Sequence, residues 1–201
     1  INIFNYFNHY FCSIVFLIIM RKTFTSLVLF FLFLSPLFAD DRNTKLDKLF
    51  NELKIKNSDN NFEIEQEIWQ IWNTHPSNDK LTNLLGTGSN YVNNNQLSKA
   101  VEIFTEVILK DPNWAEAWNK RATVLYLMGE FQKSQNDIDK VLELEKRHFG
   151  ALAGQGLVNI HLKNYEKAIK SYQEAMIVYP SMNSAELMIK KIKDMINKES
   201  I

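Results

Sequence analysis

The stretch AWNKRATVLYLMGEFQKSQNDIDKVLELEK, residues 117–146, holds two helix-forming segments on either side of Gly129. In the first segment, the large Trp118 is followed four residues later by the small Ala122, so both lie on one helix face. The second segment repeats small or apolar residues at helical spacing, at Ser134, Ile138 and Val141. Glycine readily adopts the backbone conformation that ends a helix. The stretch therefore predicts an antiparallel helix hairpin.

The same pattern recurs with a period of about 34 residues, in three successive units. Equivalent positions hold residues of similar size. They are large at Leu84, Trp118 and Leu152, and small at Gly88, Ala122 and Gly156; large at Leu97, Phe131 and Tyr165, and small at Ala100, Ser134 and Ala168; large at Phe104, Ile138 and Tyr172, and small or medium at Val107, Val141 and Ala175. Pro112 and Pro180 also match, with Lys146 between them as the exception. One hairpin cannot bury its apolar face alone, so this period predicts a stack of hairpins.

These residues resemble the tetratricopeptide repeat (TPR), in which the positions of Trp118, Ala122, Phe131 and Ser134 are large, small, aromatic and small. The resemblance covers three units, 81–114, 115–148 and 149–182, although Leu125 and Asn159 replace an aromatic residue that Tyr91 keeps. It implies an all-α fold, a right-handed superhelical stack of antiparallel helix hairpins. The strings AWNKRATVLYLMG (117–129) and RHFGALAGQG (147–156) are also similar to those of small exported TPR proteins of Gram-negative bacteria.

Both flanks of the repeats are predicted to be helical. Residues 40–80 form a divergent N-terminal hairpin with two apolar stripes, one at Leu46, Leu49, Phe50 and Leu53 and the other at Ile64, Ile68, Ile71 and Trp72. Residues 183–201 form a capping helix with one apolar face, made by Ala185, Met188, Ile192 and Met195. Terminal helices with a polar outer face close such stacks.

Residues 1–39 are predicted to be an upstream and leader segment. Met20-Arg21-Lys22 precedes an apolar run from 27 to 34, and Pro36 and Ala39 follow it, which is the pattern of a signal peptide at about 20–39. Cleavage is expected after Ala39, and Met20 is the expected start of translation. The alternative is that the apolar residues of 10–38 are retained as a membrane anchor. Either interpretation predicts an exported protein.

Composition excludes several classes of function. The chain has 23 basic and 23 acidic residues, and the first 39 hold only Arg21 and Lys22, so the remainder has two more acidic than basic residues. This balance argues against nucleic-acid binding. Cys12 is the single cysteine, and His9, His75, His148 and His161 have no other ligand residue at metal-binding spacing. The sequence predicts no cofactor, no metal site and no catalytic residue.

The resemblance implies binding of a protein or peptide partner in the concave groove that the first helices of the hairpins line. On this chain the predicted partner-binding residues are Asn119, Thr123, Tyr126, Arg121 and His161. Arg121 has a second interpretation, a structural salt bridge with Glu102, Glu106 or Asp137, which is the one we favour. Trp114 is interpreted as packing between units, with an exposed anchor for a partner as the alternative. The carboxylate clamp of TPR co-chaperones is not expected, since Leu85, Ala153 and Gly154 occupy its positions.

The predicted function is therefore a periplasmic TPR scaffold or assembly factor that binds a partner protein or peptide. The alternative is a membrane-anchored structural subunit of an envelope complex, held by the N-terminal apolar segment. No residue constellation supports an enzyme.

Overall fold

The computed structural model describes residues 41–55 and 60–199. The chain divides into two compact units, 1–45 and 46–201. The predicted leader, residues 1–39, lies outside the described residues. In the described part of the chain every regular element is a helix, and none of these helices is long and apolar enough to cross a membrane.

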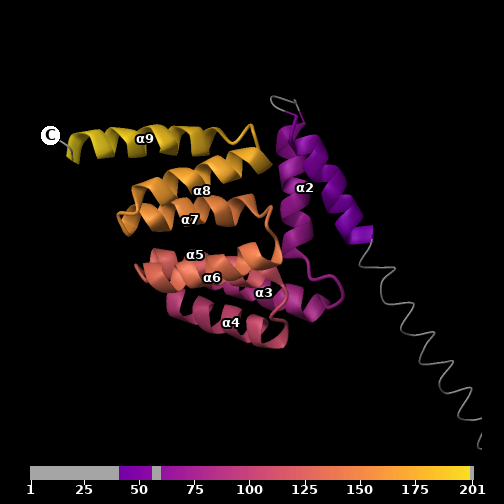
Figure 1. The fold of residues 1–201 in the computed structure, drawn as a ribbon. Coiled ribbons are helices and arrows are strands. Elements are labelled where there is room, and N and C mark those ends of the chain that lie inside the picture. The colour runs from indigo at the N-terminus through magenta and orange to yellow at the C-terminus, as the bar shows by residue number, and fades with distance from the viewer. Residues whose placement is uncertain (1–40, 56–59, 200–201) are drawn as a thin grey trace, which may run out of the picture. The chain divides into compact units, whose positions relative to one another are not determined.

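The helices follow the predicted units closely (Figure 1). A helix over residues 41–53 and α2 (Asn61–Asn73) form the N-terminal hairpin. The three repeat hairpins are α3 (Asp79–Asn93) with α4 (Leu97–Lys110), α5 (Ala115–Leu127) with α6 (Phe131–Leu144), and α7 (Phe149–His161) with α8 (Tyr165–Val178). The last helix, α9 (Asn183–Glu199), packs on α8. The all-α fold of stacked hairpins is confirmed.

Each repeat hairpin turns through one residue with a left-handed backbone. These residues are Asn95, Gly129 and Lys163, at φ of 54°, 77° and 57°, and they occupy the same position in each unit. The prediction of Gly129 as a turn is thus confirmed. Asparagine tolerates this conformation and lysine adopts it at some cost, so the repeat geometry overrides local preference at Lys163.

The small-residue positions of the first helices are close contacts. A Cβ added at Gly88 would overlap the Phe104 ring, and one added at Gly156 would lie 2.5 Å from Cε2 of Tyr172. Between them, the Ser134 hydroxyl donates a 2.8 Å hydrogen bond to the Ala122 carbonyl, which draws α5 and α6 together. The small residues of the repeat pattern therefore mark the positions at which two helices approach closely.

The N-terminal hairpin is arranged differently from a further repeat stacked ahead of α3. Its buried residues, which include Phe50 and Trp72, share one apolar cluster with Phe149 and Tyr179 of the third unit. Asn61 donates a hydrogen bond to Ser181, and the Tyr179 hydroxyl donates one to Glu65, at 2.9 and 3.1 Å. Figure 1 shows α2 running across the ends of the repeat helices. The part of the hairpin from Leu46 onward is thus tied to the last repeat.

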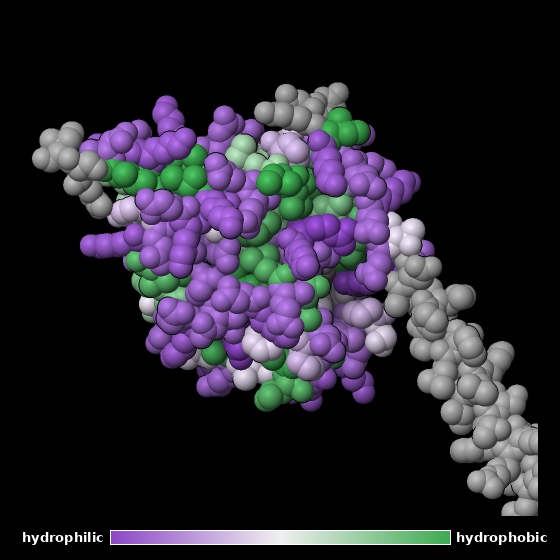
Figure 2. Space-filling model, viewed as in Figure 1, coloured by the Kyte–Doolittle hydropathy of each residue, from purple (hydrophilic) through white to green (hydrophobic). Residues whose placement is uncertain are grey.

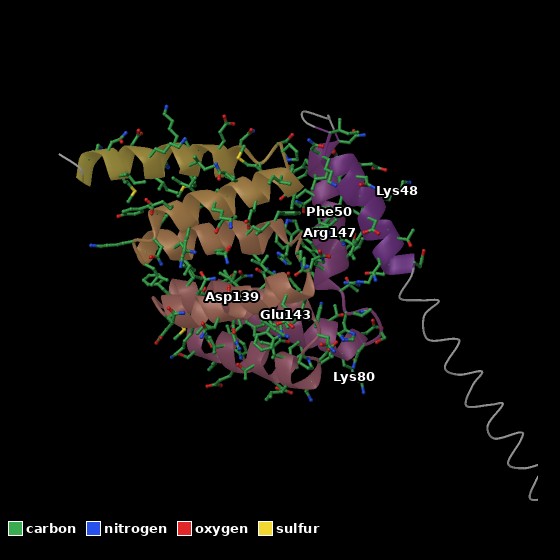
Figure 3. All side chains as sticks on the ribbon, in the orientation of Figure 1. Lys48, Phe50, Lys80, Asp139, Glu143 and Arg147 are labelled. Atoms are coloured by element: carbon green, nitrogen blue, oxygen red, sulfur yellow. The ribbon has the colours of Figure 1, made fainter. Side chains whose placement is uncertain are left out.

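The guanidinium of Arg147 strengthens this attachment. It pairs with Glu145 beside it and with Asp47 of the N-terminal hairpin. It also lies over the Phe50 ring, 4.5 Å from the centroid, and both residues are labelled in Figure 3. An arginine suits this position because its planar group can bind carboxylates and stack on a ring at the same time.

Helix α9 confirms the predicted C-terminal helix, with one difference. Ala185 and Ile192 are buried against α8, with Met188 packed beside them. Met195 is 37% exposed, and Ile189 and Ile196 contribute to the interface instead. The apolar face is therefore rotated slightly from the predicted one at the end of the helix.

The close contact at Gly88 can be tested with a matched control in the same helix. Gly88→Ala is expected to destabilise the fold by about 1–3 kcal/mol, because the new methyl group overlaps the Phe104 ring. Gly86 is exposed and has no neighbour within 4 Å of an added Cβ, so Gly86→Ala is expected to stabilise by about 0.5–1 kcal/mol. Urea unfolding of both variants measures the difference, and equal effects would contradict the contact.

Candidate functional site

The first helices of the second and third units bring most of the predicted partner-binding residues together. Asn119, Thr123 and Tyr126 of α5 and Leu157 of α7 line a small cavity of about 70 Å³. Thr123 is exposed and Tyr126 is half-buried. These side chains form the concave stripe of the middle of the stack, so the sequence register places them correctly relative to one another.

Tyr126 and His161 join two repeats at one end of this stripe. The Tyr126 hydroxyl and His161 Nε2 are 2.9 Å apart, within hydrogen-bond distance. The His161 ring is exposed and stacks on Phe131, with centroids 4.4 Å apart and planes 15° apart. Sequence reasoning named both residues but did not predict that they pair.

Asn119 differs from the prediction of an exposed amide. Its side chain is only 9% exposed, and its amide nitrogen donates a 3.1 Å hydrogen bond to Glu116 within the same helix. The amide holds a buried carboxylate in place instead of facing a partner.

Arg121 lies on the opposite side of α5 from the concave stripe. Its guanidinium makes two hydrogen bonds to the Asp137 carboxylate, at 2.7 and 2.8 Å, and a third to the Thr105 hydroxyl at 3.0 Å. The structural salt bridge is therefore confirmed. The grouping of Arg121 with the concave partner-binding residues is corrected, because its donors are engaged within the chain.

The concave stripe begins near the N-terminal end of each first helix, at Thr82, Glu116 and Gly150 in the first, second and third units. Residues 69–75 lie over this first position in the three repeats. The Thr82 hydroxyl accepts a 2.9 Å hydrogen bond from the His75 N–H, and a Cβ on Gly150 would lie 2.5 Å from the Trp69 ring. Glu116 is almost fully buried. The concave face is thus open only beyond this first turn.

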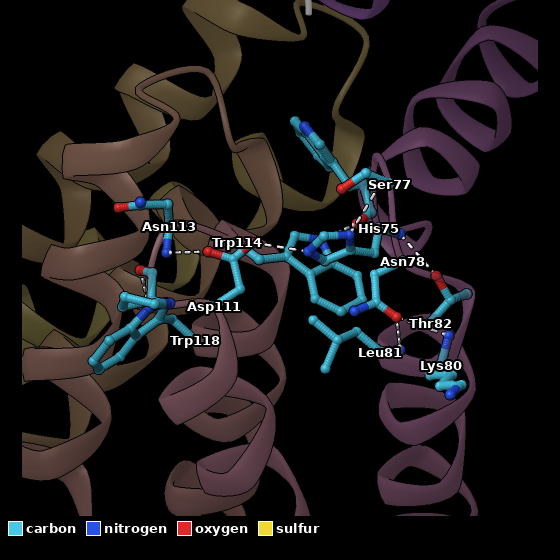
Figure 4. Close-up of polar contacts among 12 residues, drawn as sticks. His75, Ser77, Asn78, Lys80, Leu81, Thr82, Asp111, Asn113, Trp114 and Trp118 are labelled. Atoms are coloured by element: carbon cyan, nitrogen blue, oxygen red, sulfur yellow. Dashed lines mark hydrogen bonds and ion pairs between the residues drawn. The ribbon is translucent and has the colours of Figure 1, made fainter. Parts of the chain in front are cut away.

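His75 fixes the connection between α2 and α3. Its Nε2 lies 2.8 Å from Asp111 at the end of α4, and its ring packs edge-on against Trp114, as Figure 4 shows. The Trp114 indole is buried and donates a 2.9 Å hydrogen bond to the Trp72 carbonyl. The interpretation of Trp114 as packing is confirmed. Within the described residues, no group of three or more His, Cys, Asp or Glu could hold a metal ion.

The family comparisons agree with this architecture. The family model described as tetratricopeptide repeat matches residues 115–148 and 150–180. A TPR repeat-containing protein of Rhizobium etli is 30% identical over 151 residues, which cover 75% of this chain and 74% of the relative. This chain belongs to the tetratricopeptide repeat family.

More distant relatives share part of the TPR fold. Hsp70-Hsp90 organizing protein 3 of Arabidopsis thaliana is 25% identical over 113 residues, which cover 56% of this chain and 20% of that protein. The Sgt2 TPR domain from Aspergillus fumigatus superposes with a TM-score of 0.58 at 16% identity, over 61% of this chain and 83% of that one. The first TPR of Spaghetti, solved with an HSP90 peptide, gives 0.57 at 20% identity, over 59% and 94%. At these identities the solved structures show the fold.

A buried polar network beneath α2 was missed by sequence reasoning on this TPR chain. His148 Nε2 lies 3.0 Å from Glu116, and both side chains are fully buried. His148 Nδ1 accepts the Ala151 N–H and caps α7, so Nε2 carries the proton and donates to the carboxylate. Trp72 stacks on the His148 ring, 4.0 Å away. The two residues belong to different helix hairpins, and only the repeat register, which places both near the starts of neighbouring first helices, could have indicated the pair.

Two opposing effects act on the pKa of Glu116. Burial raises the pKa, but the hydrogen bond from His148 and the charge and hydrogen bond of Lys120 lower it, and the net direction is downward. Lys120 Nζ lies 3.2 Å from the second carboxylate oxygen. Because the folded-state pKa lies below the unfolded value, the ionised carboxylate stabilises the fold above the unfolded pKa. This stabilisation is lost as the pH falls through the folded pKa.

Glu116→Gln is therefore expected to remove part of the acid sensitivity of the fold. At neutral pH the substitution should cost about 1–3 kcal/mol, because a charged hydrogen-bond partner is replaced by a neutral one. Below the ordinary pKa of 4.5 for glutamate the difference from the unsubstituted chain should shrink, as measured by urea unfolding at a series of pH values. Glu106→Gln, at an exposed pair with Lys110, is the control and should change little. Parallel stability curves for Glu116→Gln and the unsubstituted chain would count against this role.

Proposed function

We propose that this TPR chain is a protein-binding scaffold and that its partner contacts the open part of the concave face. The observation that carries the proposal is the arrangement of the exposed Thr123 and His161 with the half-buried Tyr126 and Leu157 on two neighbouring first helices, α5 and α7. Tyrosine and histidine offer aromatic surface together with polar tips, which suits a mixed peptide surface. The solved neighbour from Spaghetti, bound to an HSP90 peptide, supports a peptide as the partner.

The proposed partner differs in chemistry from a peptide held by its C-terminal carboxylate. Leu85, Ala153 and Gly154 supply no cation or amide to the concave face, and Leu85 is buried. Arg121 is engaged with Asp137 on the other side of α5. A segment bound through its side chains and main chain, with no requirement for a free terminus, fits the residues that remain.

A photo-crosslinking amino acid at Thr123 tests the concave face. The chain carrying it is expected to form an adduct with a partner in cells, because Thr123 is exposed and points into the stripe. The matched control carries the crosslinker at Glu102, an exposed position on α4. The Thr123 adduct should be lost when Tyr126→Ala is added, while thermal unfolding changes by no more than about 1 kcal/mol. An adduct that survives Tyr126→Ala, or forms equally from Glu102, would refute the assignment.

We also propose that the chain acts outside the cytoplasm, as an assembly factor or scaffold in the cell envelope. The support is the signal-peptide pattern of residues 20–39, with its charged start, apolar run and small residue at Ala39. Mass spectrometry of the protein isolated from cells is expected to find a mature N-terminus at Asp40. Peptides from the apolar part of 10–38 in the isolated protein would instead favour the anchored subunit.

A further inference from the structure

Two equivalent grooves lie between the second helices of successive repeats, away from the concave face. The first lies between α4 and α6 and has a volume of about 390 Å³; the second lies between α6 and α8 and has a volume of about 440 Å³. The first is lined by Val101, Arg121, Leu125, Lys133, Asn136 and Asp137. The equivalent positions one repeat later hold Gln135, Gln155, Asn159, Lys167, Lys170 and Ser171, all of which line the second. The grooves are therefore repeat equivalents with different chemistry.

The first groove satisfies its own polar groups. Arg121 lies along it and binds Asp137 through two hydrogen bonds and Thr105 through a third. Val101 and Leu125 supply apolar contacts at its base, and Leu125 is buried. Two repeats can therefore stack through a fully hydrogen-bonded ion pair and two apolar side chains. Neutral polar residues are not needed at these positions for packing.

The second groove, called here the amide groove, has a neutral polar residue at each of these four positions. Gln155 and Ser171 replace the ion pair, and Gln135 and Asn159 replace the two apolar residues. Asn159 and Ser171 are buried. Burying amides and hydroxyls contributes less to stability than burying the apolar groups found one repeat earlier. The substitutions thus weaken the packing and place carboxamides and a hydroxyl in a groove of similar size, where the first groove has an engaged ion pair.

The side chains of the amide groove are held in position by one another. Ser171 donates to the Gln155 oxygen at 2.9 Å, and Asn159 donates to the Gln155 backbone carbonyl at 2.9 Å and to the Gln135 oxygen at 3.3 Å. The Gln135 nitrogen donates to Asp139 at 2.7 Å. The Gln155 amide nitrogen has no hydrogen-bond partner among the described residues and remains available to a ligand. A preordered polar surface binds with a smaller loss of side-chain entropy than a mobile one.

The charges and shape of the amide groove restrict the ligand. Asp139, labelled on α6 in Figure 3, and Glu174 balance Lys167 and Lys170, so neither a phosphate nor a strongly basic ligand is favoured. The described residues that line the groove include no aromatic side chain on which a base could stack. Figure 2 shows mainly hydrophilic surface on the viewed face. Leu162 is the one apolar side chain among the described residues that line the groove, whereas a bound amphipathic helix needs a continuous apolar groove.

We propose that the amide groove binds an extended peptide segment through its main chain. Carboxamides present one acceptor and two donors, which match the N–H and C=O groups that an extended chain exposes. The volume lies within the range of about 300–1,000 Å³ that is usual for ligand sites. This site lies on a different side of α7 from Gly150, Gly154 and Leu157, so it does not depend on the concave-face proposal.

The first groove supplies the design of the test. Gln155→Arg with Ser171→Asp transfers the Arg121–Asp137 pair into the amide groove and should replace its carboxamide and hydroxyl with charges that bind each other, without lowering the unfolding midpoint. A second variant, Gln135→Val with Asn159→Leu, transfers the apolar pair instead. These two are called the closed variants, because the polar groups that they replace are no longer available to a ligand. Thr123→Ala with Tyr126→Ala is the matched control on the concave face. Linear peptides of about twelve residues, selected from a displayed random library on the full chain, are the probes, and fluorescence anisotropy measures their affinity.

A class of selected peptides is expected to bind both closed variants about tenfold or more weakly than the unsubstituted chain, and to bind the concave-face variant unchanged. N-methylation of central residues in these peptides should weaken binding as much, because it removes main-chain donors, whereas alanine substitution of single side chains should have smaller effects. The proposal is overturned if no selected peptide depends on the groove residues, or if N-methylated peptides bind normally. The proposal is also overturned if the unsubstituted chain binds members of an oligosaccharide array and only the closed variants lose this binding, because the ligand of the groove would then be a sugar.

Discussion

In the first and third repeats a bulky side chain of the second helix lies against a position on the first helix that has no room for a larger residue, and in the middle repeat a hydrogen bond joins the two helices at the same position. Phe104 meets Gly88, Tyr172 meets Gly156, and in the middle repeat Ser134 bonds the backbone at Ala122. These contacts set the distance between the two helices of a hairpin, and their regular spacing along the chain gives successive hairpins the same geometry. The concave stripe and the two grooves follow from this regularity, because equivalent residues recur at equivalent places.

The N-terminal hairpin adds a constraint that crosses the repeats instead of extending them. Trp69, Trp72 and His75 contact the first turns of all three first helices, and Tyr179 and Ser181 hold the other part of the hairpin to the third repeat. These contacts join segments from opposite ends of the described chain, which repeat stacking alone does not do. The same crossing covers the Glu116–His148 pair and limits the concave face to its later turns.

Residue pattern predicted the hairpins and the close-packing positions, because these depend on contacts within about one period of the sequence. It also placed Thr123 and Tyr126 on one face and named Asp137, with Glu102 and Glu106, among three possible partners of Arg121. The hydrogen bond from Asn119 to Glu116 was not predicted, and neither was the Glu116–His148 pair, which lies where α2 crosses α5 and α7. No local spacing encodes that crossing: the aromatic residues of α2 look like an ordinary apolar stripe until their partner surface is known.

Departures from the repeat pattern have two different physical origins in this chain. Glu116 and Gly150 occupy equivalent repeat positions but differ in chemistry, because the N-terminal hairpin lies over both. The carboxylate of Glu116 binds His148, and Gly150 has no side chain because the Trp69 ring occupies that space. Gln155, Asn159 and Ser171 also depart from their equivalents, yet no other part of the described chain lies over the amide groove to account for them. Where a contact within the chain explains a polar substitution, the substitution is structural. Where no such contact explains it, as in the amide groove, a bound ligand is the better explanation.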